Sequence, residues 1–184
     1  MISIKPKWCE LIASGQKTIE VRKTKPKLET PFKVYIYCTN TRPYLVWGDV
    51  FRGDWETEFT HLYGYNRKDA EKIWDVFNGK VIGEFVCDEI VAAECGCYCN
   101  LDPTKTLLQA IELLDYADGK RVYGWHISDL EIYDTPKELS EFYRHDTTYD
   151  NSFGGYFEDR DKRTPITRPP QSWCYVESVE GEKG

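Results

Sequence analysis

Short stretches in which apolar and polar residues alternate constrain the fold of this chain more than any other feature. Residues 18–23 read TIEVRK and residues 33–39 read KVYIYCT, and a period of two is typical of a β-strand with one buried face. Both stretches are brief, so we expect short strands. Further strands are predicted over residues 1–4, 80–95, 122–134 and 172–177.

The alternation also predicts which side chains are buried. In the first stretch, Ile19 and Val21 would point to one face of the strand, and Glu20 and Arg22 to the other. Gly83 interrupts a longer apolar run, and we expect a bend or a β-bulge there. One shared core is predicted for the apolar residues Ile19, Val21, Val34, Ile36, Val81 and Phe85.

Helical segments are fewer. Pro6 suits the first turn of a helix, where its missing N–H is no loss, and Gly15 would end that helix in a left-handed conformation. A second helix is predicted to begin at Asp102–Pro103, and a capping box at Thr135 predicts a short third helix through Phe142. The apolar faces expected on the first two helices are Trp8, Leu11 and Ile12, and Leu107, Leu108, Ile111 and Leu114.

The spacing of these elements predicts the domain organisation. A chain of 184 residues fits a single domain, residues 1–184. Residues 40–79 break the strand rhythm and are interpreted as an insertion with one helix over residues 67–77, and residues 143–171 predict a long polar loop. Short, unevenly spaced strands with few helices favour an α+β domain containing a small β-barrel of about five to seven strands, flanked by short helices.

Charge is concentrated near the start of the chain. Residues 1–33 hold eight basic and three acidic residues, whereas the whole chain has a formal net charge of −7. Such asymmetry is typical of one surface that attracts an anion on an otherwise acidic protein. A solvated basic strand edge, which resists aggregation, would give the same pattern.

The sequence shows neither an export signal nor an apolar run of the roughly 18 residues that a membrane span requires. We therefore expect a cytoplasmic protein with no membrane partner, whose seven cysteines are reduced thiols. Cys95, Cys97 and Cys99 alternate and would place three sulfurs on one side of a strand. Because this is not the spacing of a zinc knuckle, we expect no metal and no cofactor.

Residues 3–23, SIKPKWCELIASGQKTIEVRK, resemble the opening of the ASCH domain (activating signal cointegrator homology), a family of the PUA-like superfamily. That opening has a strand, a helix, and then a glycine followed by Lys-x-x-Glu-x-Arg, which stand here as Gly15, Lys17, Glu20 and Arg22. The resemblance implies a β-barrel with a cleft around this motif, in a superfamily that binds RNA or nucleotides. Residues 80–95 and 122–142 extend the resemblance.

The resemblance also implies possible enzymes. Some members of the family resemble ribonucleases, and some small ones are amidohydrolases that remove an acyl group from acylated cytidine, which would make Lys17 and Glu20 catalytic. In the amidohydrolases a threonine stands where Glu20 stands here. Thr18 lies on the same strand face, but two residues are about 6 to 7 Å along a strand, so Thr18 is not a simple replacement.

The motif residues suit the binding of an anionic or carbonyl-bearing ligand. Arg22 offers planar, bidentate donors and Lys17 a compact charge, so together they can hold a phosphate or polarise a carbonyl. The Glu20 carboxylate can accept a hydrogen bond from the amino group of a base. The alternative is a surface ion pair, which would contribute under about 1 kcal/mol to stability.

Two further groups of residues complete the expected surface. Lys23, Lys25 and Lys27 would project to one side of an extended chain, as a strip that follows an RNA backbone. Aromatic and basic residues predicted to contribute to the ligand cleft beside the motif are Lys5, Trp125 and His126.

Three functions remain open at this point. The first is an RNA- or nucleotide-binding domain that uses the Gly-x-Lys-x-x-Glu-x-Arg cleft. The second is a hydrolase on the same cleft, acting on RNA or a modified nucleoside. The third is a protein-interaction domain that binds a partner through residues 40–79.

Overall fold

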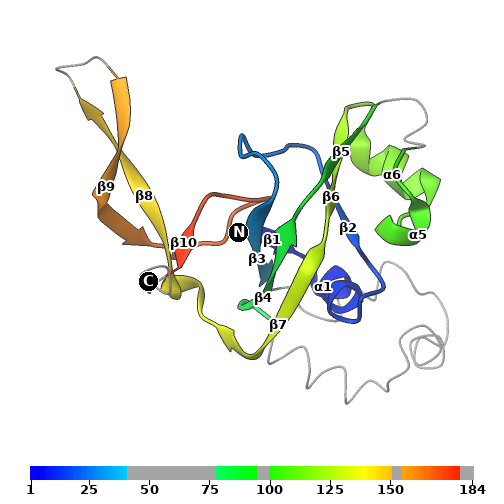
Figure 1. The fold of residues 1–184 in the computed structure, drawn as a ribbon, viewed down its shortest axis with the longest axis horizontal. Coiled ribbons are helices and arrows are strands. Elements are labelled where there is room, and N and C mark those ends of the chain that lie inside the picture. The colour runs from blue at the N-terminus through cyan, green and yellow to red at the C-terminus, as the bar shows by residue number, and fades with distance from the viewer. Residues whose placement is uncertain (41–77, 95–99, 151–154, 179–184) are drawn as a thin grey trace.

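The computed structural model describes residues 1–40, 78–94, 100–150 and 155–178. These residues form more strands than helices, and the strands pair into three sheets (Figure 1). The expected α+β class is confirmed. Within the described residues the strands do not pair into one closed barrel, so the barrel stays a prediction, as does the assignment of residues 1–184 to one domain.

Sheet A has four strands in the order β1–β3–β4–β7. β1 (Ile2–Ile4) is parallel to β3 (Phe32–Cys38), and it leads into helix α1 (Pro6–Ala13). β4 (Val81–Cys87) is antiparallel to both of its neighbours, β3 and β7 (Ser128–Lys137). The strand expected at residues 1–4 is therefore an edge strand of this sheet.

Sheet B has three antiparallel strands in the order β2–β6–β5. They are β2 (Ile19–Arg22), β6 (Val122–His126) and β5 (Ile90–Ala93). Two short helices, α5 (Pro103–Thr106) and α6 (Ala110–Ala117), lie on the connection between β5 and β6.

Sheet C forms an arm that extends from the rest of the described chain (Figure 1). It consists of the hairpin β8 (Phe142–Asp150) and β9 (Gly155–Pro165), with β10 (Glu177–Ser178) beside β8. The long polar loop expected at residues 143–171 is therefore wrong over most of its length. Backbone pairing in a ribbon needs no apolar face, so its strands carry no alternation of apolar residues to detect.

The two long strands expected at residues 80–95 and 122–134 are each two strands. The first run divides into β4 and β5, and the second into β6 and β7. In both runs the chain leaves one sheet and enters the other, near Asp88 and Ile127. The sequence pattern does not show such a crossing, because it does not tell with which sheet each half of the run pairs.

Gly83 lies where the sheet is irregular, as expected. The register between β4 and β7 shifts between Val81 and Gly83, and the opposite neighbour, β3, shifts between Ile36 and Tyr37. A Cβ atom on Gly83 would lie 2.3 Å from the backbone oxygen of Glu131. Only glycine allows the two strands to approach this closely.

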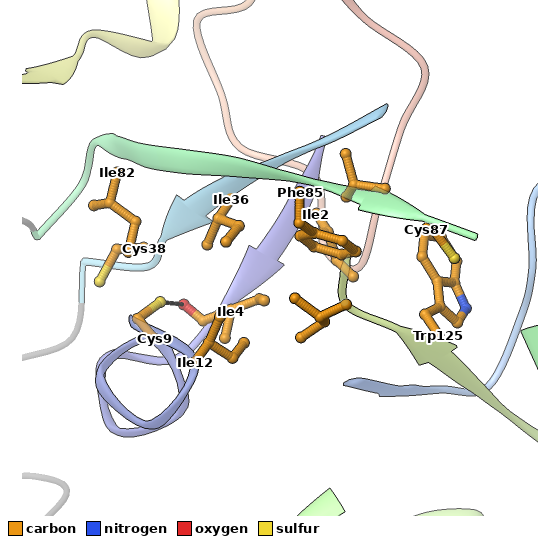
Figure 2. Close-up of a cluster of buried hydrophobic side chains, with 12 residues drawn as sticks. Ile2, Ile4, Cys9, Ile12, Ile36, Cys38, Ile82, Phe85, Cys87 and Trp125 are labelled. Carbon is orange, nitrogen blue, oxygen red and sulfur yellow. Dashed lines mark hydrogen bonds between the residues drawn. The ribbon is translucent and has the colours of Figure 1, made fainter. Parts of the chain in front are cut away.

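Buried side chains form three clusters rather than one core. The first fills the space between sheet A, α1 and β6 (Figure 2), the second lies between sheet B and α6, and the third lies under β8. The single core expected for six apolar residues is wrong, because alternation tells which residues share a face but not what covers that face. Val34, Ile36 and Phe85 are in the first cluster, Val21 in the second and Val81 in the third.

The first helix is confirmed and the second is corrected. Gly15 has φ +72° after α1, as expected. Leu107 has φ +55° and separates α5 from α6, so the helical phase restarts at Gln109, which caps α6. The buried residues of α6 are therefore Leu113 and Ala117, whereas Ile111 and Leu114, expected to be buried, are 61% and 45% exposed.

Two C-terminal expectations are corrected as well. Thr135 still belongs to β7, and the helix after it is a single 3-10 turn, Leu139–Glu141, capped by Glu138. The strand expected at residues 172–177 is reduced to β10 and an isolated antiparallel bridge between Ile2 and Trp173.

Several expectations concern residues outside the described ranges. The helix over residues 67–77 and Cys95, Cys97 and Cys99 lie there, and so does nearly all of the insertion at residues 40–79. No helix in the described part of the chain is long and apolar enough to cross a membrane. Among the same residues, no group of His, Cys, Asp and Glu is arranged to hold a metal ion.

Candidate ligand-binding site

The turn after α1 places Lys17 against the helix that precedes it. Gly15 reverses the chain, and the backbone N–H of Lys17 donates to the carbonyl of Leu11 at 2.8 Å. The next residue, Thr18, donates its N–H to the carbonyl of Lys105 at 3.0 Å. The start of β2 is thus fixed between α1 and α5, and the Lys17 side chain enters the space between them.

The Lys17 amine is buried among three partners. Its Nζ donates to the carbonyl oxygen of Thr106 at 2.5 Å and lies 3.5 Å from Oε2 of Glu20. The same atom lies 4.9 Å from the ring centroid of Trp8, which is a cation–π contact. The residue is only 2% exposed, so this lysine is not a solvated surface charge.

Arg22 connects the motif to sheet A. Its Nη2 lies 2.9 Å from Oε1 of Glu20 and donates to the carbonyl of Ser3, in β1, at 2.6 Å. Glu20 therefore binds Lys17 with one oxygen and Arg22 with the other. Because Glu20 is 6% exposed, the surface ion pair considered from the sequence is excluded. We refer to Lys17, Glu20 and Arg22 as the ionic cluster.

The electrostatics of the ionic cluster act on Lys17. Burial lowers the pKa of the Lys17 amine below its ordinary value, Glu20 acts to raise it, and Arg22 lowers it further. With Lys17 protonated, the cluster contains two cations and one carboxylate. The Nε of Arg22 is buried and has no hydrogen-bond acceptor within the described chain.

Two residues of α1 with shifted pKa values were not identified from the sequence. Burial raises the pKa of the Cys9 thiol, and its neighbours Cys38 and Glu20 raise it further. Burial also raises the pKa of Glu10 to about 7, and no described residue donates to its Oε2. The helical stripe of apolar residues pointed to Trp8 and Ile12 and gave no signal for these two.

The other expected site residues are not members of the ionic cluster. Trp125 pairs with Glu20 across the β2–β6 ladder, but its side chain is buried in the first apolar cluster. His126 lies at the end of β6 and pairs with Asp88 at 2.6 Å. Lys5 is exposed just before α1. None of the three makes the contacts that hold Lys17, Glu20 and Arg22 together.

The lysines of the expected strip are all exposed. Nζ of Lys23 lies 5.2 Å from the ring centroid of Tyr116, and Nζ of Lys25 lies 5.9 Å from that of Tyr123. The backbone N–H of Lys27 donates to the hydroxyl of Tyr175 at 2.9 Å. The strip therefore runs from the ionic cluster, along sheet B and α6, to the C-terminal segment.

Comparison with known proteins identifies the family. The model of the ASCH domain matches residues 2–115. This chain belongs to the ASCH domain family. The match spans α1, the ionic cluster and α5, and it ends within α6.

Solved structures of the family resemble this chain at low sequence identity. The crystal structure of ASCH from Zymomonas mobilis is 21% identical, with a TM-score of 0.49, and the match covers 75% of this chain and 71% of that one. A tyrosine-to-phenylalanine mutant of it is 19% identical, with a TM-score of 0.49 over 75% and 73% of the two chains. A serine-to-alanine mutant is 22% identical, with a TM-score of 0.48 over 75% and 72%. No curated protein matches this chain.

Proposed function

We propose that this ASCH domain binds RNA or a nucleotide, with the ionic cluster as the centre of its site. The observation that carries the proposal is the imbalance of two cations, the buried Lys17 and the largely buried Arg22, against one carboxylate, Glu20. Burying an uncompensated charge is costly, and an anionic group of a ligand would balance it. The unpartnered Nε of Arg22 is a donor still available for that group.

The exposed lysines beyond the cluster fit a nucleic-acid strand better than a small anion alone. Lys23, Lys25 and Lys27 follow directly after Arg22, and phosphate contacts of this kind position a strand without reading its sequence. Lys5, Trp125 and His126 are secondary members of the proposed site, because their side chains take no part in the ion pairs of the cluster.

Replacement of Lys17 by methionine tests the proposal. Lys17→Met keeps most of the length and the apolar stem of the side chain and removes its charge, so binding of single-stranded RNA and of mononucleotides should weaken about tenfold or more. Lys7→Met is the matched control, because Lys7 makes a similar contact with Trp8, at 4.8 Å, but no salt bridge with Glu20. Equal affinities of Lys17→Met and Lys7→Met would remove the ionic cluster from the site.

The salt dependence of RNA binding tests the role of the lysine strip. Neutralising Lys23, Lys25 and Lys27 together should weaken RNA binding and reduce its salt dependence by up to about three counterions. Binding of a mononucleotide should change far less. If RNA binding by the triple variant and by the wild type depends equally on salt, the strip is a solvated strand edge that does not contact RNA.

Hydrolysis is the second candidate, and the lowered pKa of Lys17 favours it. A buried lysine whose pKa is lowered gives up its proton more readily, which suits acid–base work on a ribose hydroxyl or an acyl group. The assay is turnover of RNA and of acylated cytidine by wild type and Lys17→Met. Loss of turnover with an intact fold supports an enzyme, whereas equal turnover excludes Lys17 as the catalytic group.

A further inference from the structure

A second site is suggested by an open groove of about 780 Å³ whose lining does not include Lys17, Glu20 or Arg22. It lies between β3, the segment at Pro26 and Leu28, the start of β8 and the C-terminal segment, residues 173–177. This volume is typical of small-molecule sites in proteins. Six of its lining residues are aromatic: Phe32, Tyr35, Trp125, Tyr143, Trp173 and Tyr175.

The C-terminal wall of the groove is held in place from two sides. Trp173 bridges to Ile2 on the free edge of β1, and its indole N–H donates to the hydroxyl of Thr24 at 2.9 Å. Tyr175 accepts a hydrogen bond from the backbone of Lys27. The two rings meet edge to face, with centroids 5.4 Å apart and planes at 80°. Both rings are therefore oriented before any ligand binds.

The floor of the groove contains an unsatisfied donor. Trp125 packs 6.0 Å from Trp173 and 5.8 Å from Phe32, measured between ring centroids, and is 2% exposed. Its indole N–H is buried and has no acceptor in the described part of the chain. Figure 2 shows this nitrogen on the edge of the ring that faces away from Ile4 and Ile12. Buried donors without acceptors are rare in proteins, and such a group is often completed by a ligand or by water.

The charge of the groove differs from that of the whole protein. Lys33 and Arg144 line it together with one acidic residue, Glu177. Lys33 pairs with Glu84 and Glu177 with Arg163, so Arg144 supplies the positive charge of the rim on a chain of net charge −7. Arg144 is exposed. Aromatic faces with a basic side chain at the rim match a base and its phosphate. An apolar peptide would use the rings but not Arg144.

We propose that this groove binds an unpaired base of single-stranded RNA, stacked on Tyr175, with a flanking phosphate at Arg144. The choice of RNA as the ligand rests on the proposed function, but the site does not include Lys17, Glu20 or Arg22. Tyr175 is the stacking residue because it is 50% exposed. The chain from Arg22 to Pro26 spans at most about 14 Å, so the lysine strip leads from the ionic cluster to the groove.

The test compares two ligands and two variants of one residue. The ligands are a fluorescently labelled single-stranded RNA of mixed sequence and the same oligonucleotide with abasic sites throughout. Tyr175→Ala should weaken binding of the RNA about tenfold or more, which corresponds to the loss of one stacked base, and should leave binding of the abasic strand unchanged. Tyr175→Phe keeps the ring and should restore most of the affinity.

The contact with phosphate is tested separately. Arg144→Gln should reduce the salt slope of RNA binding by about one counterion. Arg168→Gln is the matched control, because Arg168 is an exposed arginine outside the groove lining. Equal slopes for the two variants would overturn the assignment of a phosphate to Arg144.

The outcomes separate this inference from the proposed function. If wild type and Tyr175→Ala bind the RNA equally while Lys17→Met binds it weakly, the groove is not a base site and the ionic cluster stands. If Tyr175→Ala alone weakens binding, the groove stands and the cluster does not. If wild type binds no RNA, and an apolar peptide quenches the tryptophan fluorescence instead, the groove binds peptide and both proposals fail.

Discussion

The two faces of sheet B are both buried, but they are closed in different ways. On one face Val21 packs with Val122, Leu113 and Ala117 in an apolar cluster. On the other face Glu20 pairs with two cations, Lys17 and Arg22, beside its ladder partner Trp125. Apolar side chains need only complementary shapes to pack, whereas a buried group of charges is stable only when each charge has its partner. The two faces should therefore respond very differently to the loss of one side chain.

The largest effect is expected on the ionic face. Glu20→Ala leaves Lys17 and Arg22 buried without their shared carboxylate, and it should reduce the free energy of unfolding by about 3–5 kcal/mol. Urea unfolding measures this effect. Glu94→Ala is the control, because the Glu94–Arg121 pair is mostly exposed and its loss should cost less than about 1 kcal/mol. Similar losses of unfolding free energy for Glu20→Ala and Glu94→Ala would contradict the burial of the ionic cluster.

On the apolar face, two adjacent leucines separate burial from sequence pattern. Leu113 is 5% exposed and Leu114 is 45% exposed. Leu113→Ala should cost about 2–4 kcal/mol, and Leu114→Ala about 0.5 kcal/mol or less. The same unfolding experiment applies to both. A larger loss of unfolding free energy for Leu114→Ala than for Leu113→Ala would support the apolar helix face predicted from the sequence. It would contradict the break in the helix at Leu107.

The smallest effect is a dependence on pH. The pKa of Lys17 is lowered in the folded protein from an ordinary value of 10.5, so between the two values the unfolded chain binds more protons. Stability contributed by Lys17 therefore rises as the pH increases toward 10.5 and is least at neutral pH. The difference in free energy of unfolding between wild type and Lys17→Met should shift in favour of wild type from about pH 7 to about pH 10. A constant difference would mean that Lys17 is not desolvated.

Local features of the fold were predictable from the sequence. The strand at Ile19–Arg22, the helix from Pro6, the left-handed Gly15 and the irregularity at Gly83 all depend on a few neighbouring residues. Such features follow from backbone geometry and periodicity, which act over short distances.

Features set by distant contacts were not predictable in the same way. Nothing in the two long apolar runs shows that each crosses between sheets, and nothing in the helical stripe shows the break at Leu107. The motif indicated Lys17, Glu20 and Arg22 as a group. Their burial depends on Trp8, the carbonyl of Thr106 and the carbonyl of Ser3, and two of these partners are backbone atoms that carry no sequence signal.

The two crossings between sheets have a mechanical consequence. Because β4 pairs with β7 and β5 pairs with β6, one continuous two-stranded ribbon turns a corner near Asp88 and Ile127 and belongs to both sheets. At that corner the backbones of two adjacent strands join sheet A to sheet B. Arg22 pairs with Tyr123, three residues beyond His126, or about 10 Å from the corner. The hydrogen bond from Arg22 to Ser3 therefore ties sheet B to the edge strand of sheet A at a second point, distant from the corner.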